Sequence, residues 1–254
     1  MNIREILDRQ EPTLGVMLSE FANPNITRIF QEAGFQFVII DDEHGYFDFT
    51  QLAALIGVAS GRGFPMIVRI PGVSREYITK VLDMGASGIL VPMVNTPEQA
   101  LEIVSYSKYT PLGKRGISTT RAHTNYNPPP LKTYLPVANQ NTATIIQLET
   151  AEAIHNAEKI IQIDGIDAVM IGPNDLAADL GKPGEVSSSA VLEAVEHVAA
   201  ICKTCNKPAG VITGNAQLIS FSRQHGFTLF SVGSELDLLL KGGKARVTDF
   251  YARQ

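Results

Sequence analysis

Three acids and a histidine directly follow an apolar run in the first fifth of the chain. Residues 35–41 read FQFVIID, which is typical of a buried strand, and Asp41, Asp42, Glu43 and His44 stand where that strand leaves the core. Ionisable groups packed at a strand end are costly unless something binds them. An imidazole beside a carboxylate suits proton transfer near neutral pH. A turn with solvated charges is the alternative, and the other strand ends decide between the two.

Two further carboxylates follow strand-like runs later in the sequence. Glu149 ends the run TIIQLE, and Asp175 follows the run DAVMIG within IGPNDL. Carboxylate oxygens are preferred ligands of hard divalent cations, and two protein ligands leave positions for water and a chelating substrate. The pair therefore predicts a catalytic metal site for Mg²⁺ or Mn²⁺. Alternatively, each acid opens a helix and interacts with the helix dipole.

Apolar runs with strand character alternate with helical segments along the whole chain. The runs are residues 13–18, 35–41, 65–70, 88–93, 144–149, 167–172, 208–213 and 228–233. Such alternation is typical of a parallel sheet that helices cover. Eight strand–helix units predict an α/β protein, a single (β/α)8 TIM barrel spanning residues 1–254. A doubly wound open sheet is the alternative, but no G-x-G-x-x-G follows the first strand.

The active site of a TIM barrel lies at the carboxyl ends of its strands. Arg69 lies in the third strand near its carboxyl end and joins His44, Glu149 and Asp175 at that pole, so a purely solvated turn becomes a weaker interpretation. None of the lysines falls within a strand near its carboxyl end, where a Schiff-base lysine would be desolvated. We therefore favour a metal mechanism over an imine mechanism.

Composition excludes several other classes of protein. The chain is 44% hydrophobic, and its 21 basic and 26 acidic groups give a net charge of −5 without a long block of either sign. This argues against a nucleic-acid partner or a membrane partner. No secretory signal or membrane-length apolar run is visible, so we expect a soluble cytoplasmic protein. Cys202 and Cys205 lie late in a predicted helix without a second ligand pair, which disfavours a redox or zinc site.

Several motifs taken in order resemble those of one enzyme family. IIDDEHG, RIPG, VLDMGASGILVPMVNTPEQA, GKRGIS, IIQLET, IGPNDLAADLG, AGVITGN and FTLFSVGSELDLL resemble the metal-dependent class II pyruvate aldolases of the HpcH/HpaI family. That family includes 4-hydroxy-2-oxoheptanedioate aldolase and the aldolases for 2-keto-3-deoxy sugar acids. The resemblance implies a phosphoenolpyruvate/pyruvate-type barrel. It also implies reversible cleavage of a 4-hydroxy-2-oxo acid to pyruvate and an aldehyde through a metal-stabilised enolate.

The resemblance also implies roles for individual residues. Glu149 and Asp175 would hold Mg²⁺, Mn²⁺ or Co²⁺, and Arg69 would contact the keto oxygen. His44 with Asp41 matches a histidine–aspartate dyad that acts on the C4 hydroxyl. The other implied residues are Gln147 at the oxo acid, Asp83 as an acid donated by a neighbouring subunit, and Gly172, Pro173, Asn174 and Asp175 around the substrate carboxylate.

Asp42 and residues 108–136 each lead to a separate prediction. Asp42 adds an acid where relatives often have a smaller or neutral residue, and we expect it to point into solvent rather than to alter acceptor choice or His44. Residues 108–136 are long for a loop, with basic residues and three consecutive prolines. They predict either a lid that receives an anionic substrate group or a connection that packs against a neighbouring subunit.

The C-terminal sequence ELDLLLKGGKARVTDFYARQ predicts an apolar helix. Leucines 238–240 and a second apolar set at 247–251 flank Gly242 and Gly243, which could form a hinge. An exposed helix of this kind is a liability in a monomer, so we expect a homo-oligomer. The resemblance implies a homohexamer built from dimers that exchange this helix.

Other functions use similar residues. An oxaloacetate decarboxylase or a related synthase would form the same enolate, and a citrate-lyase-like acyl-CoA lyase is a more distant option. A phosphosugar enzyme could use TGN and VGSE after strands seven and eight, but it would not explain Glu149 and Asp175. A catalytically silent barrel would lack one of the four strand-end groups, and none is missing.

Overall fold

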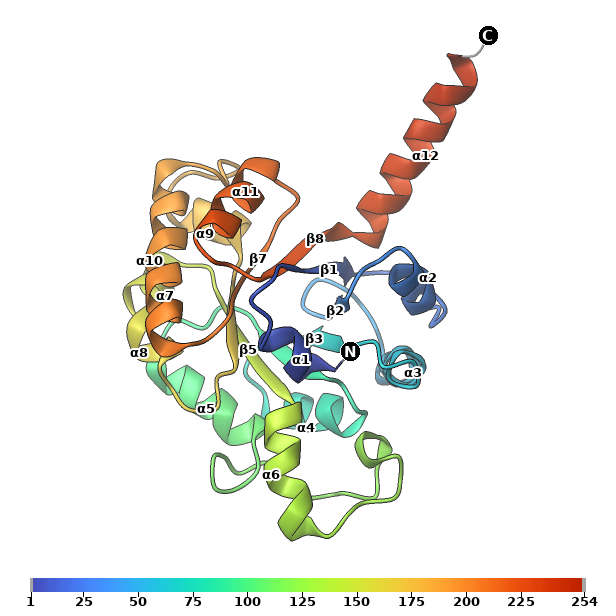
Figure 1. Ribbon diagram of the computed structural model, residues 1–254, viewed down its shortest axis with the longest axis vertical. Coiled ribbons are helices and arrows are strands. Elements are labelled where there is room, and N and C mark those ends of the chain that lie inside the picture. Colours follow the sequence, from blue (N-terminus) through green and yellow to red (C-terminus); the bar gives the residue numbers. More distant parts are fainter. Residues whose placement is uncertain (1, 253–254) are drawn as a thin grey trace.

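Parallel strands close into a barrel in the computed structural model, which describes residues 2–252 (Figure 1). The strands are β1 Thr13–Leu18, β2 Phe37–Asp41, β3 Met66–Arg69, β4 Gly88–Val91, β5 Ala143–Leu148, β6 Ala168–Ile171, β7 Ala209–Ile212 and β8 Leu229–Ser234. Each strand pairs in parallel with the next, and β8 closes on β1. The predicted TIM barrel is confirmed, and each predicted strand is present within about two residues of its expected bounds.

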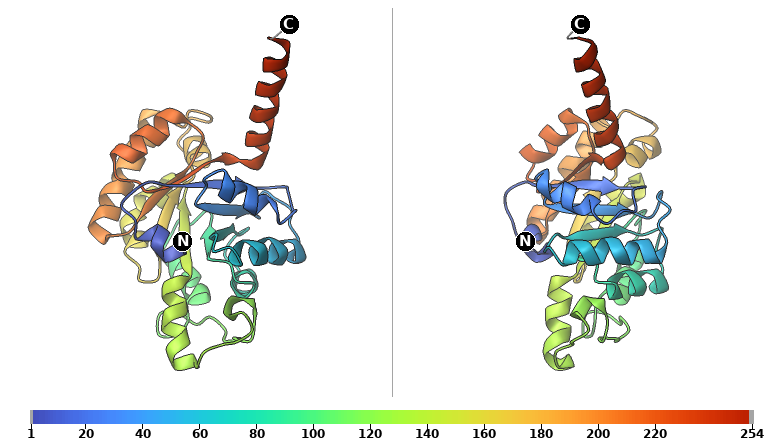
Figure 2. Two further views of the ribbon diagram at one scale, coloured as in Figure 1. Left: turned by 45° about the vertical axis from the view of Figure 1, so that its right-hand side comes forward. Right: turned by 90° about the vertical axis from the view of Figure 1, so that its right-hand side faces the viewer.

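Helices surround the barrel, as Figures 1 and 2 show. They are α1 Ile3–Leu7, α2 Ile26–Glu32, α3 Phe49–Ser60, α4 Arg75–Asp83, α5 Pro97–Ser107, η1 Ala122–Thr124, α6 Leu131–Asn141, α7 Ala151–His155, α8 Ala157–Ile161, α9 Pro173–Asp179, α10 Ser189–Cys205, α11 Ala216–Gln224 and α12 Glu235–Tyr251. Several begin at side-chain caps. Asp48 and Thr96 each form a capping box with a glutamine three residues on. Within residues 2–252 no helix has the length and apolarity to span a membrane.

Strand alternation separates two hydrophobic clusters and also positions the polar groups. Residues such as Ile39, Ile67 and Ile145 fill the barrel interior together with α1, while their neighbours pack against the surrounding helices. Successive strand residues point to opposite faces, so the residues two positions further on also face inward. These are Asp41, Arg69 and Gln147, which therefore point into the carboxyl pole of the barrel.

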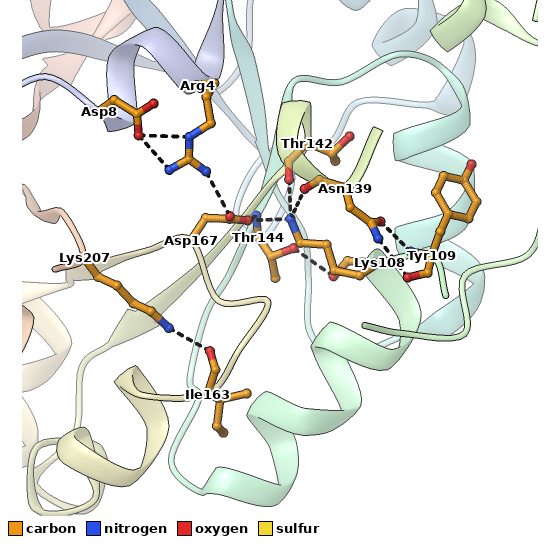
Figure 3. Close-up of polar contacts among 11 residues, drawn as sticks. Arg4, Asp8, Lys108, Tyr109, Asn139, Thr142, Thr144, Ile163, Asp167 and Lys207 are labelled. Atoms are coloured by element: carbon orange, nitrogen blue, oxygen red, sulfur yellow. Dashed lines mark hydrogen bonds and ion pairs between the residues drawn. The ribbon is translucent and has the colours of Figure 1, made fainter. Parts of the chain in front are cut away.

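The amino pole is closed by α1 and by a buried lysine (Figure 3). Lys108 Nζ donates to the carbonyl oxygens of Asn139 at 2.9 Å and Thr142 at 2.5 Å, and to Asp167 Oδ2 at 2.6 Å. Arg4 from α1 donates to Asp167 Oδ1 at 3.4 Å. Burial lowers the pKa of Lys108 despite the Asp167 charge. Lys108, at the end of α5, thus joins the end of α6 to the segment before β6 at the pole opposite the predicted site.

Residues 108–136 also lie at the amino pole. Arg115 Nη2 donates to Asp83 at the end of α4 at 2.7 Å, and His123 Nδ1 lies 3.2 Å from the Asp83 carbonyl oxygen. The expected uninterrupted loop is wrong, because it contains η1 and residues 131–136 already belong to α6. The lid interpretation is also wrong for the chain's own barrel, since this segment is anchored at the opposite pole. Packing against a neighbouring subunit stays a prediction.

Helix α12 projects away from the barrel, as both views of Figure 2 show. The side chains of Leu239 and Phe250 are each 63% exposed, so the apolar surface of this helix has no cover within the described chain. The helix runs unbroken through Gly242 and Gly243, and the predicted hinge is therefore wrong.

Candidate active site

Four polar side chains are buried together with the carboxyl ends of β2, β3 and β5. Asp41, Arg69, Gln147 and Glu149 are all less than a tenth exposed. Asp41 and Arg69 are register partners on adjacent strands, which places their side chains next to each other. The strand-end groups that the sequence singled out are thus brought together on β2, β3 and β5, while His44 and Asp175 lie exposed at their rim.

Arg69 is held by two acids. Its Nε and Nη2 donate to Asp41 Oδ1 at 3.0 Å and Oδ2 at 2.7 Å, and Nη1 lies 3.0 Å from Glu43 Oε2. Burial disfavours the guanidinium charge, but the bonds to Asp41 and the charges of Glu43 and Glu149 outweigh it and raise the pKa of Arg69. Arg69 therefore carries a fixed positive charge beside Glu149. Glu43, which was not predicted to have a role of its own, also pairs with Arg69.

Glu149 is the most perturbed acid of the site. Its Oε1 accepts the Met93 N–H at 2.7 Å, and its Oε2 accepts a hydrogen bond from Gln147 Nε2. Burial raises the pKa of Glu149 to about 7; these two bonds oppose the rise, and the charges of Glu43 and Asp175 add to it. Glu43, Glu149 and Asp175 thus interact electrostatically close to Arg69. This concentration of negative charge favours binding of a further cation.

Met93 was not predicted as a site residue. It follows β4 with a positive φ of 54°, a conformation that non-glycine residues rarely adopt. This conformation turns its N–H toward Glu149. Backbone strain of this kind is concentrated at functional sites. The only sequence signal for Met93 is its position at the carboxyl end of the predicted strand 88–93.

The side chains around Glu149 are suited to binding a divalent cation. Gln147 Oε1 is buried without a hydrogen-bond partner, so an acceptor oxygen is available beside Glu149. A Cβ atom at Gly172 would lie 2.3 Å from Glu149 Oε2 and 2.6 Å from Gln147 Nε2, so only glycine leaves the carboxylate room. Among residues 2–252, no group of three or more His, Cys, Asp or Glu side chains is arranged to hold a metal. Glu149 and Asp175 would therefore share the ion with other oxygens.

Gly172 to Asp175 form the start of α9. Gly172 is the N-cap and Pro173 the first helical residue, while Asn174 and Asp175 lie exposed in the first turn. The first N–H groups of a helix lack intrahelical partners and favour anions. This location is compatible with the predicted contact to a substrate carboxylate.

The turn that carries His44 is shaped by Asp41. Asp41 Oδ1 accepts the backbone N–H groups of Glu43 at 3.2 Å and His44 at 3.3 Å. The carboxylate thus orients the turn through its backbone and orients Arg69 through the side chain. A direct bond between Asp41 and the His44 imidazole, as in the predicted dyad, stays a prediction.

Asp42 does not point into solvent, and that expectation is wrong. Its side chain is buried and accepts the backbone N–H of Phe47. Burial raises the pKa of Asp42 to about 6, with a smaller contribution from the charge of Asp41. The extra acid closes the turn from residue 42 to residue 47.

Asp83 lies outside this cluster. It ends α4 at the amino pole, where it pairs with Arg115. Within one chain it therefore cannot take part in chemistry at the carboxyl pole. Its donation to a neighbouring subunit remains a prediction.

A TIM barrel that gathers a buried arginine and several acids at the carboxyl ends of its strands has these groups where enzymes of this fold carry their active sites. The family model HpcH/HpaI aldolase/citrate lyase matches residues 15–241. The chain belongs to this family, as the motifs had indicated.

Curated relatives and solved structures cover nearly the whole chain. A 4-hydroxy-2-oxovalerate aldolase from Novosphingobium aromaticivorans is 36% identical over 230 residues, 90% of this chain and 86% of the relative. A hydroxypyruvate/pyruvate aldolase from Roseovarius nubinhibens is 33% identical over 228 residues, 90% of this chain and 88% of the relative. The crystal structure of an HpcH/HpaI aldolase from Desulfitobacterium hafniense has a TM-score of 0.91 at 30% identity, covering 98% of this chain and 96% of that one.

Proposed function

We propose that this protein is a divalent-metal-dependent aldolase that reversibly cleaves a 4-hydroxy-2-oxo acid to pyruvate and an aldehyde. The names of the curated relatives support the aldolase reaction. The observation that carries the proposal is the buried Arg69, which Asp41 and Glu43 hold beside the cation-ready Glu149. We take the whole chain, residues 1–254, to act as one barrel domain in the cytoplasm.

The oxo acid end of the substrate would bind at the buried half of the site. Glu149 and Asp175 would hold the cation, which when bound supplies Lewis-acid polarisation of the keto group. Gln147 has a free buried oxygen and lies close to Gly172, so the two would line the pocket for the oxo acid. The start of α9 would receive the substrate carboxylate. Arg69 would donate to the keto oxygen.

Cleavage then follows from the positions of Arg69 and His44. His44 takes the proton of the C4 hydroxyl, the C3–C4 bond breaks, and the aldehyde forms from C4. The electron pair of the broken bond moves to the C2 oxygen and gives the pyruvate enolate. Arg69 stabilises the negative charge at that oxygen, an interaction that is stronger in the transition state than in the ground state. Protonation at C3 from solvent completes pyruvate, and His44 returns its proton to solvent.

We also propose a homo-oligomer, specifically a homohexamer built from dimers that exchange α12. The exposed apolar residues of α12 would be buried on a second copy, and Asp83 would complete a neighbouring site. Light scattering at micromolar concentration tests association. A mass of one 27.5 kDa chain would contradict it.

The function is tested by aldehyde-dependent consumption of pyruvate over a panel of aldehydes with Mg²⁺, Mn²⁺ or Co²⁺. We expect chelator to abolish the reaction and one or more of these cations to restore it. An oxaloacetate decarboxylase would form the enolate without consuming any aldehyde. Full activity in chelator, or borohydride trapping of a pyruvate–lysine adduct, would contradict the metal mechanism.

A further inference from the structure

A buried acid lies where α12 leaves the barrel. Glu235 is the first residue of α12 and is only 3% exposed, whereas most of the helix beyond it is exposed. Its Oε1 accepts the backbone N–H groups of Ser19 at 2.8 Å and Glu20 at 2.7 Å. Bonds from N–H groups to a carboxylate are stronger than neutral ones. Glu235 therefore clamps the backbone after β1 to the root of α12, which lies beside β1 in Figure 1.

The clamped backbone touches the turn that carries His44. A Cβ atom at Gly45 would lie 2.7 Å from the Ser19 carbonyl oxygen and 2.1 Å from the Asp41 carbonyl oxygen. Only glycine therefore allows the turn to pack this closely on Ser19. The Tyr46 hydroxyl forms a hydrogen bond with the Glu20 side chain and adds a second contact. The two residues that follow His44 thus rest on the two residues that Glu235 holds.

The other half of the site has supports of its own, although it shares Asp41 and Glu43 with the turn that carries His44. Arg69 is fixed by Asp41 and Glu43 side chains, and Glu149 by Met93 and Gln147. None of these groups bonds to Ser19, Glu20 or Glu235 in the contacts that hold them. A displacement of the backbone at residues 19 and 20 would therefore displace the turn that carries His44 before it displaces Arg69 or Glu149.

We propose that Glu235 is a positioning residue, which rests on the aldolase function proposed above. It holds the backbone of residues 19 and 20, and through Gly45 and Tyr46 it keeps the His44 imidazole aimed at the C4 hydroxyl. Glu235 touches neither substrate nor His44. Its loss should slow the proton transfer of cleavage and leave enolate formation from pyruvate intact.

Two measurements on one set of variants separate these steps. The first is kcat for aldol cleavage, and the second is exchange of pyruvate C3 protons with deuterium oxide without aldehyde, followed by NMR. For Glu235→Ala we expect cleavage to fall between about 10-fold and 100-fold, the scale of a misplaced catalytic group, while exchange stays within about 2-fold. His44→Ala should give the same pattern.

Conservative and control variants sharpen the test. Glu235→Gln should restore most of the cleavage, because an amide oxygen accepts the same two N–H groups. Asp237→Ala should leave both activities unchanged, since that acid in the first turn of α12 pairs with the exposed Lys241. If Glu235→Ala does not fold, Tyr46→Phe removes the hydroxyl that bonds to Glu20 and should give a weaker loss of the same kind, in cleavage and not in exchange.

An unchanged ratio of cleavage to exchange in Glu235→Ala, or a parallel loss of both, would overturn the inference. So would a Tyr46→Phe variant that loses both activities equally. Wild-type protein that shows neither activity with any cation would instead overturn the aldolase function itself, and this inference with it.

Discussion

Replacing Arg69 by alanine should remove the positive charge at the keto oxygen. The guanidinium is 7% exposed and makes three close contacts, at 3.0 and 2.7 Å to Asp41 and 3.0 Å to Glu43. A buried donor at a developing oxyanion contributes about 10²- to 10³-fold to kcat, or about 2.7–4 kcal/mol. The variant also leaves two acids unpaired where negative charge develops. We therefore expect a loss near the upper limit, about 10³-fold.

The same substitution should cost stability. Removing one partner of a buried ion pair typically costs about 3–5 kcal/mol, so unfolding by denaturant must be measured beside activity. Arg69→Lys should restore about 10-fold at most, because an ammonium lacks the planar fork that bonds Asp41 on two atoms. Arg62→Ala is the matched control, since Arg62 bonds only to exposed side chains of α2 in its described contacts.

The assay is steady-state cleavage of a 4-hydroxy-2-oxo acid at saturating cation, with coupled detection of pyruvate. A kcat for Arg69→Ala within about 2-fold of wild type would refute the role of the guanidinium. Full rescue by lysine would show that only the charge matters and not the geometry that Asp41 imposes.

Three further predictions follow from the structure. Burial raises the pKa of Glu149 to about 7, so protons should compete with the cation for this carboxylate. The Kd for Mn²⁺ should therefore rise about 10-fold from pH 8 to pH 6. Titration calorimetry showing no pH dependence would contradict this. Gly172→Ala should raise KM for the oxo acid at least about 10-fold, because its Cβ would meet Glu149 and Gln147. The control Gly57→Ala should leave KM unchanged, because a Cβ atom there would lie in open space. Equal KM values in the two variants would count against the site. Lys108→Met should lower the free energy of unfolding by about 3–5 kcal/mol and leave kcat near wild type, because the lysine closes the far pole; denaturant midpoints and kcat together check this.

The barrel could be predicted from the sequence because its signals are local. Each strand is a short apolar run, and the groups that end these runs meet at one pole in any parallel barrel. That is why Arg69, Glu149 and His44 were identified without a structure. The resemblance to the family then supplied Gln147 and the start of α9.

The wrong predictions, and the site residue that was not predicted, depend on contacts that the sequence pattern does not encode. Asp42 is buried because Phe47 folds back to donate its N–H, a turn geometry that charge alone does not reveal. Glu43 pairs with Arg69 only because of the register between β2 and β3. Helix α6 begins directly after three prolines and contains Pro136, so its composition predicted a loop. Gly242 and Gly243 suggested a hinge, but helical neighbours on both sides keep α12 continuous.

A cation and Arg69 are proposed to stabilise the enolate of pyruvate at this pole of the barrel. Exchange of the pyruvate C3 protons with deuterium oxide, without any aldehyde and followed by NMR, tests this role. We expect exchange by wild-type protein with Mg²⁺, Mn²⁺ or Co²⁺, its loss in chelator, and a loss of about 10² or more in Arg69→Ala. Wild-type protein that never exchanges these protons with any of the cations would rule out enolate stabilisation at this pole.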